Sequence, residues 1–187
     1  MPIRLRTSFY AAAAVVLLAS PAWSQQPAGS IMGDLRKDVA DVQSKFVALA
    51  KAMPAHKYEW QPGDSIRSLR EVFLHVAADN YFMPAMVGVK PEPGTGIDPA
   101  NFKTLAAYEK QKLDPAATTA ALERSFAHLL KVMDETPDSK LTERVKFFGQ
   151  DMSAQRLWVA TTTHLHEHLG QAIAYARMNG VTPPWSK

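Results

Sequence analysis

Apolar residues recur at alternating spacings of four and three residues in four separate stretches of the chain. This periodicity gathers apolar side chains on one face of an α-helix, the face that packs into a helical core. The pattern predicts helices over 31–53, from 68 to the region of Pro84, over 115–136 and over 151–179. Runs that alternate apolar and polar residues like a β-strand are absent. These helices predict an all-α, antiparallel four-helix bundle.

Capping residues mark where these helices begin. Ser68 is followed three residues later by Glu71, the spacing of a capping box. Asp114 followed by Pro115 predicts the start of the third long helix, because proline is favourable at the first helical position. Three of the long helices end or bend near a proline: Pro54, Pro84 or Pro137.

The connections between the helices differ in length. Residues 88–99 are rich in Gly and Pro and predict a loop. A short extra helix over 98–112 is expected between the second and third long helices, and this long stretch allows a crossover. Residues 142–149 predict a connector, whose Phe147 and Phe148 are placed to cover one end of the bundle.

Two of the four helical patterns carry polar residues at core positions. In the second helix these are His75 and Asp79; in the fourth they are Thr161, His164, His168 and Gln171. An unsatisfied buried polar group costs about 1–3 kcal/mol. These side chains must therefore satisfy one another, bind a ligand or line a wet cavity. His166 lies two residues from each of its histidine neighbours and points elsewhere, while His56 and His128 lie off the core faces and receive no role.

A metal site would satisfy these polar groups together. His164 and His168 are four residues apart and share one helix face, a common way to present two imidazoles to one ion. With His75 they make three nitrogen ligands and leave a position open for water or substrate. Asp79, one turn from His75, is the candidate catalytic base or partner of a ligand histidine. The alternative is a set of core histidines hydrogen-bonded to their neighbours.

Two blocks of sequence carry a resemblance to a known family. The first is SLREVFLH, residues 68–75, with Asn80 following. The second is HLHEHLGQ, residues 164–171, continued by YARMNGVTPP, residues 175–184. Together they resemble the DinB-like superfamily of metal-binding four-helix bundles, over residues 31–185. One departure is Leu169, where the family often has Arg.

This resemblance implies a divalent metal, zinc first and nickel second, held by His75 from the second helix and by the pair His164 and His168. It also implies functions such as thiol transfer, thiol-dependent isomerisation or hydrolysis of a small-molecule substrate. Dimers are frequent in the family, so a homodimer is a further expectation.

The N-terminal residues predict export. Arg4 and Arg6 precede an apolar run, and small residues at Ala22 and Ser24 fit signal peptidase. We therefore expect a signal peptide over 1–24, a disordered lead-in over 25–30, a bundle domain over 31–187, and a periplasmic or secreted protein with no membrane segment after cleavage. Because the family's thiol transferases use cytosolic thiols, export argues against that activity.

The amino-acid composition excludes several kinds of site and partner. The 187 residues include no cysteine, which excludes disulfides and thiolate ligands. Removing residues 1–24 lowers the 21 basic side chains to 19 against 18 acidic ones, a net charge of +1. Nucleic acid is therefore not an expected partner. The function hypotheses are an exported metal-dependent enzyme of hydrolase or transferase type, a non-catalytic metal- or small-ligand-binding bundle, and a b-type haem bundle.

Overall fold

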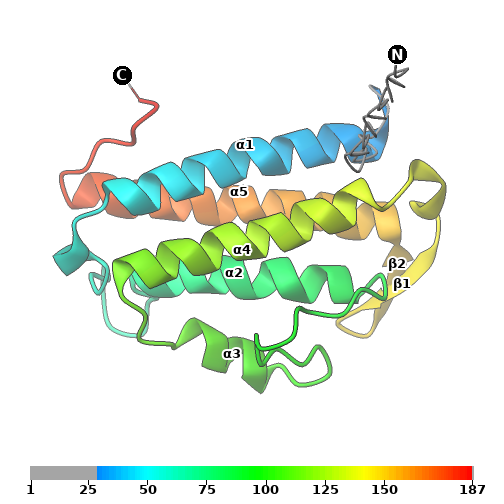
Figure 1. The fold of residues 1–187 in the computed structure, drawn as a ribbon, viewed down its shortest axis with the longest axis horizontal. Helices are drawn as coiled ribbons and strands as arrows, with labels where there is room; N and C mark the ends of the chain where they lie inside the picture. Colours follow the sequence, from blue (N-terminus) through cyan, green and yellow to red (C-terminus); the bar gives the residue numbers. More distant parts are fainter. Residues whose placement is uncertain (1–28, 187) are drawn as a thin grey trace, which may run out of the picture.

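Four long helices form the bundle that the hydrophobic pattern predicts (Figure 1). The structure is a computed structural model and describes residues 29–186, so the expected signal peptide and residues 25–28 of the lead-in lie outside the described residues. The long helices are α1 (Ile31–Ala52), α2 (Leu69–Ala85), α4 (Pro115–Asp134) and α5 (Ala154–Met178). Short 3₁₀ turns follow α1 and α4, at Ala55–Lys57 and Asp138–Lys140. The all-α four-helix bundle is confirmed.

Each long helix packs against one antiparallel and one parallel neighbour (Figure 1). Helix α2 packs against α4 and α5, and α1 packs against the same two helices. Helices α1 and α5 run opposite to α4 and α2, and α2 and α4 run in the same direction. This arrangement requires a crossover between α2 and α4, which the long connection supplies. It places α2 antiparallel to α5, the two helices that carry the core histidines.

Each long helix begins at a residue whose side chain caps it. Ser30, Ser68, Asp114 and Ser153 accept hydrogen bonds from backbone N–H groups of the first turn. The capping box of Ser68 and Glu71 is complete, and Pro115 occupies the first turn of α4. These contacts satisfy amides that have no partner within the helix, so the predicted starts of α2 and α4 are confirmed.

The connection between α2 and α4 contains the expected extra helix, α3 (Lys103–Glu109), which packs on α2. It is shorter than predicted because residues 98–102 form turns, with the Thr104 hydroxyl donating to backbone carbonyls of Asp98 and Asn101.

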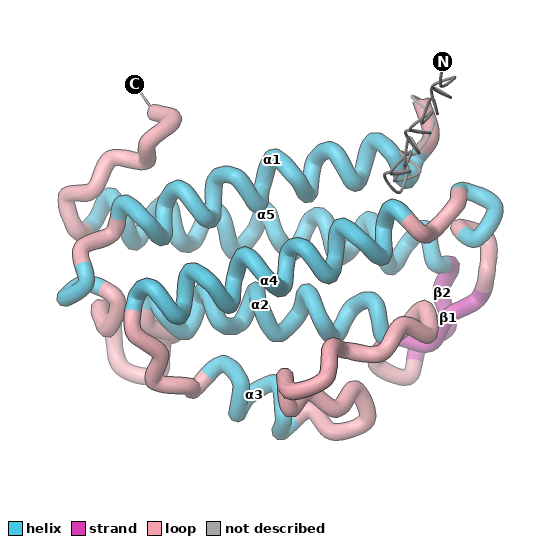
Figure 2. The backbone as a smooth tube through the Cα atoms, viewed as in Figure 1, coloured by secondary structure: helices cyan, strands magenta, loops and turns pink. Residues whose placement is uncertain are grey.

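The connector before α5 is a β-hairpin, which the sequence pattern missed (Figure 2). Strands β1 (Arg144–Phe147) and β2 (Gln150–Ser153) pair antiparallel. The turn residues Phe148 and Gly149 have φ values of 49° and 77°, the two positive values that a tight type I′ hairpin turn requires. Four-residue strands are too short to show a period of two, and a Phe-Gly turn lacks the usual Asn-Gly signal. The Phe147 and Phe148 rings both lie near Phe82, with centroids 6.4 Å and 6.3 Å away. Phe148 also stacks on Phe102, although it is 66% exposed.

Helix α2 lies at the centre of the packing. Of its 17 residues 15 are buried, so it has almost no solvent-facing side. His75 is the exception within its interior, with 17% of its side chain exposed. The ring therefore faces an opening in an otherwise closed core. None of the helices in the described part of the chain combines the length and apolar character of a membrane span.

Candidate metal centre

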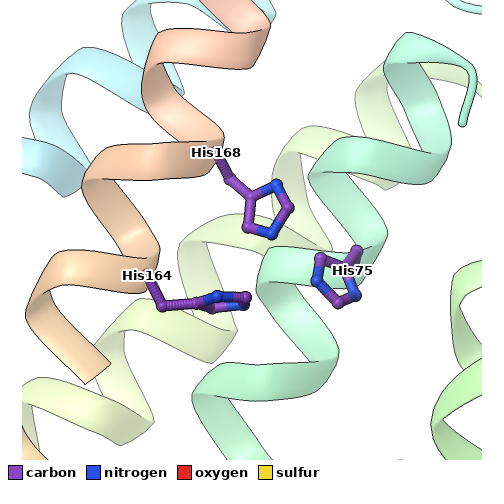
Figure 3. Close-up of side chains that lie close together, drawn as sticks. All are labelled: His75, His164 and His168. Atoms are coloured by element: carbon purple, nitrogen blue, oxygen red, sulfur yellow. The ribbon is translucent and has the colours of Figure 1, made fainter. Parts of the chain in front are cut away.

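Three histidine rings converge between α2 and α5 (Figure 3). His75 comes from α2, and His164 and His168 lie one turn apart on α5. The His75 ring centroid is 5.3 Å from that of His164 and 4.5 Å from that of His168; the two rings on α5 are 4.5 Å apart. The structure thus brings together the three residues that the spacing selected.

The ring nitrogens are close enough for one ion. One nitrogen from each ring lies within 4.8 Å of the others, and all three residues are partly buried. A tetrahedral zinc ion with bonds of ~2.0–2.1 Å separates its ligand nitrogens by about 3.4 Å. Small side-chain rotations would bring the rings to that spacing, so the donor set and its geometry fit a divalent cation.

Two of the rings have a fixed orientation because their second nitrogen meets an acceptor. His75 Nδ1 lies 3.2 Å from Glu109 Oε2. His168 Nδ1 lies 2.8 Å from Gln171 Oε1, and the Gln171 amide donates to the Tyr175 hydroxyl. An amide oxygen accepts, so Nδ1 of His168 carries the proton and the Nε2 lone pair of that ring is available to a metal. His75 lies between two carboxylates, because its Nε2 is 3.2 Å from Asp79 Oδ2.

The protonation states of His168 and Glu109 favour metal binding. Burial lowers the pKa of His168 to about 4, and the nearby His75, His164 and Arg67 act in the same direction against the hydrogen bond to Gln171. The ring is neutral at pH 7, as a metal ligand must be. Burial alone would raise the pKa of Glu109, but hydrogen bonds from His75 and Arg67, with their charges, lower it to about 2.

Asp79 lies on the ligand side of the cluster. Its Oδ2 is 2.8 Å from His164 Nε2 and 3.2 Å from His75 Nε2. The carboxylate behind His75 is that of Glu109, so Asp79 shares the space in which an ion would bind. It is placed either to act on a group beside that ion or to bind the ion itself.

The other polar residues that the sequence placed at core positions find hydrogen-bond partners in two ways. Gln171 joins the histidine cluster, as described. Thr161 is satisfied by its own helix, with its hydroxyl donating to the Leu157 carbonyl. His166 is exposed and its Nδ1 lies 2.9 Å from the Thr162 carbonyl, so it points away as predicted. His128, placed off the core face by the pattern, is instead 7% exposed. Its ring lies 5.1 Å from that of Tyr81 on α2, and Glu92 of the connection is 3.7 Å from its Nδ1.

Sequence reasoning missed Glu109 and Arg67. Arg67 Nε donates to Glu109 Oε1 over 2.7 Å, and Glu109 reaches His75 from α3. Neither residue lies on a core-facing periodic position of a long helix, so no local signal marks it. Only the packing of α3 on α2 brings them to the centre.

A cavity of about 540 Å³ adjoins the histidines. Glu109 and Gln171, which contact His75 and His168, form part of its wall. It is lined by Gln61, Ser65, Ile66, Arg67, Glu71, Glu109, Lys110 and Gln171. Its volume is in the range of small-molecule sites.

Comparisons with known proteins agree with this fold. The family model of the DinB superfamily matches residues 39–172. A crystal structure of a DinB-like protein from Bacillus cereus is similar with a TM-score of 0.69 at 16% sequence identity, covering 84% of this chain and 98% of that one. A DinB-like protein from Bacillus subtilis gives a TM-score of 0.61 at 13% identity, covering 80% and 93%. No curated protein sequence matches the chain.

Proposed function

Since the chain belongs to the DinB superfamily, we propose that His75, His164 and His168 bind one divalent metal ion in an open, catalytic site of hydrolase or transferase type. The observation that carries the proposal is the convergence of three ring nitrogens within 4.8 Å beside a cavity. Three protein ligands with a free position are typical of catalytic zinc, whereas structural sites are closed by a fourth ligand.

The donor set favours zinc, with nickel second. Imidazole nitrogens suit both ions, and the absence of cysteine removes the thiolates that would select softer metals. Glu109 and Gln171 support metal binding by the histidines, because a carboxylate or amide behind a ligand histidine fixes the ring and increases its basicity.

Within the site each residue has a separate task. A bound ion would supply Lewis acidity toward an oxygen or sulfur of the reactants. Asp79, within 3.2 Å of two ligand nitrogens, is the proposed general base. The adjoining cavity would hold the small-molecule substrate, with the amide of Gln171 at the boundary between substrate and ligand.

Metal binding is tested by elemental analysis and zinc titration of the purified protein. Wild type should bind one ion per chain, and the double variant His164→Ala/His168→Ala should bind none. His166→Ala is the matched control, because this histidine lies on the same helix and outside the cluster. Unchanged metal content in the double variant would refute the assignment.

A non-catalytic metal-binding role is the second candidate, and the position of Asp79 favours it. A carboxylate oxygen 2.8 Å from His164 Nε2 can become a fourth ligand and close the site. The variant Asp79→Asn separates the two functions. A base role predicts retained zinc affinity with lost turnover of ester, amide or thiol-transfer substrates. A ligand role predicts affinity lowered about tenfold or more and no turnover by the wild type.

We further propose that the protein is exported and acts in the periplasm or outside the cell. Support comes from residues 1–24, with two arginines, an apolar run and small residues at the cleavage position. N-terminal sequencing of the protein from cell fractions tests this: a periplasmic or secreted form beginning near Gln25 is expected. An intact N-terminus in the cytosolic fraction would contradict it. Light scattering of the same sample measures whether it forms the proposed homodimer.

A further inference from the structure

A second cavity, of about 470 Å³, lies on another side of α3. Its wall combines α2, the loop at residues 92–95, α3 and the first half of α4. Tyr108 and Glu109 are consecutive on α3, and Tyr108 lines this cavity whereas Glu109 lines the one beside the histidines. The second cavity is therefore separate from the metal centre and shares only α3 and α2 with it.

Two buried phenols line this cavity without a protein partner. Tyr81 is 2% exposed and Tyr108 is 9% exposed, and their rings meet edge to face with centroids 6.3 Å apart. Within residues 29–186 neither hydroxyl makes a hydrogen bond to the protein, and neither oxygen is among the fully enclosed polar atoms that lack a partner. Their hydroxyl groups are therefore open to the cavity that both residues line. Two donors free of protein acceptors at one cavity suit a ligand that accepts hydrogen bonds.

The hydroxyls are donors across the ordinary pH range. Burial raises the pKa of Tyr108, and burial with the nearby Tyr108 raises that of Tyr81; Glu92 adds to both shifts and Arg124 opposes them. A neutral phenol donates one hydrogen bond. The ligand must therefore offer acceptor atoms to both.

The charges at the cavity mouth restrict the ligand further. Arg124 is exposed, lines the cavity and forms no ion pair within the described part of the chain. Glu92 lies at the same rim, 3.7 Å from the buried His128. One free guanidinium attracts an anion and pairs well with a planar carboxylate. The nearby carboxylate of Glu92 disfavours a doubly charged group such as phosphate.

We propose that this cavity binds a small aromatic carboxylate, with its carboxylate accepting hydrogen bonds from Arg124 and the hydroxyls of Tyr81 and Tyr108. Its ring would pack edge to face with the two phenols, since aromatic pairs favour that geometry. The remaining wall is small and apolar, formed in part by Leu113, Ala117 and Ala121. A flat ring fits such a wall better than a branched chain does.

Fluorine NMR with 4-fluorobenzoate tests the site on the purified protein. Wild type should bind it saturably with a Kd of roughly 1 mM or below. Arg124→Gln should weaken binding about tenfold or more, because a charge-assisted contact is lost. Tyr81→Phe and Tyr108→Phe each retain the ring and should weaken binding about threefold or more. Circular dichroism verifies that each variant folds.

Three controls make the outcome decisive. Arg156→Gln removes an exposed arginine at the start of α5, outside the cavity, and should leave binding unchanged. The uncharged 4-fluorobenzamide should bind at least about tenfold more weakly. The His164→Ala/His168→Ala variant should bind 4-fluorobenzoate like the wild type. The proposal is overturned by absent saturable binding, by equal binding of Arg124→Gln, or by loss of binding in the histidine variant.

Discussion

Replacing His168 by glutamine should make the stability of the metal-free protein less sensitive to acid. The His168 ring is partly buried between α2 and α5, and burial lowers its pKa to about 4 from 6.5. Between these two values the unfolded chain binds a proton at this residue and the folded protein does not. Falling pH therefore favours the unfolded state across this window.

The size of the effect follows from the two pKa values. Above pH 6.5 the ring is neutral in both states, so it adds no pH dependence. At about pH 4.5 the linkage relation gives a loss of about 2.5 kcal/mol relative to neutral pH, and partial exposure of the ring reduces this to about 2 kcal/mol. That is a large share of the ~5–15 kcal/mol by which a domain is stable.

Urea unfolding measures this loss. Wild type and His168→Gln are unfolded at about pH 7 and about pH 4.5 with a chelator present, because bound metal would stabilise the folded state. The fall in unfolding free energy should be about 2 kcal/mol smaller in His168→Gln. His56→Gln, which removes an exposed histidine, should fall like the wild type. Equal falls in wild type and His168→Gln would refute the reasoning.

The remaining predictions concern one ligand support and three parts of the fold. Glu109→Gln should weaken zinc affinity about tenfold or more in calorimetric titration, because His75 loses its carboxylate; equal affinity would show that this contact is dispensable. Ser68→Ala should lower the unfolding free energy by about 1 kcal/mol in urea titration through loss of the α2 cap, and no change would contradict the capping argument. Phe126→Ala should cost about 3–5 kcal/mol in the same assay, because Phe126 is fully buried; a cost under about 1 kcal/mol would mean that the core refills the space. Gly149→Ala should cost about 1–2 kcal/mol, since its φ of 77° is unfavourable for alanine, and unchanged thermal stability would mean that the turn rearranges.

The sequence predicted the features that depend on local periodicity. Helix faces follow from spacings of three and four, and caps such as Ser68 and Asp114 act within three residues of their own position. The convergence of His75 with His164 and His168 followed because the core faces of bundle helices must meet. Each of these predictions needed only the residue spacing within single helices and the rule that apolar faces pack together.

The features that the sequence did not reveal depend on contacts between distant segments. Glu109 reaches His75 only because α3 packs on α2, and the burial of His128 depends on Tyr81 of α2 and Glu92 of the connection. The hairpin turn uses Phe148 at positive φ, a conformation that its residue type does not announce. The two cavities arise from the same tertiary arrangement and have no linear motif.

Helix α3 contributes one residue to each cavity, so its local stability affects both. It has seven residues and packs chiefly on one helix, so it should open in local fluctuations that leave the four long helices folded. Each opening would separate Glu109 from His75 and remove Tyr108 from the second cavity, while the three histidines stay on the bundle. Amide hydrogen exchange should therefore be faster in α3 than in α2. A ligand that closes the second cavity would slow this exchange, and through α3 it would keep the carboxylate behind His75 in place.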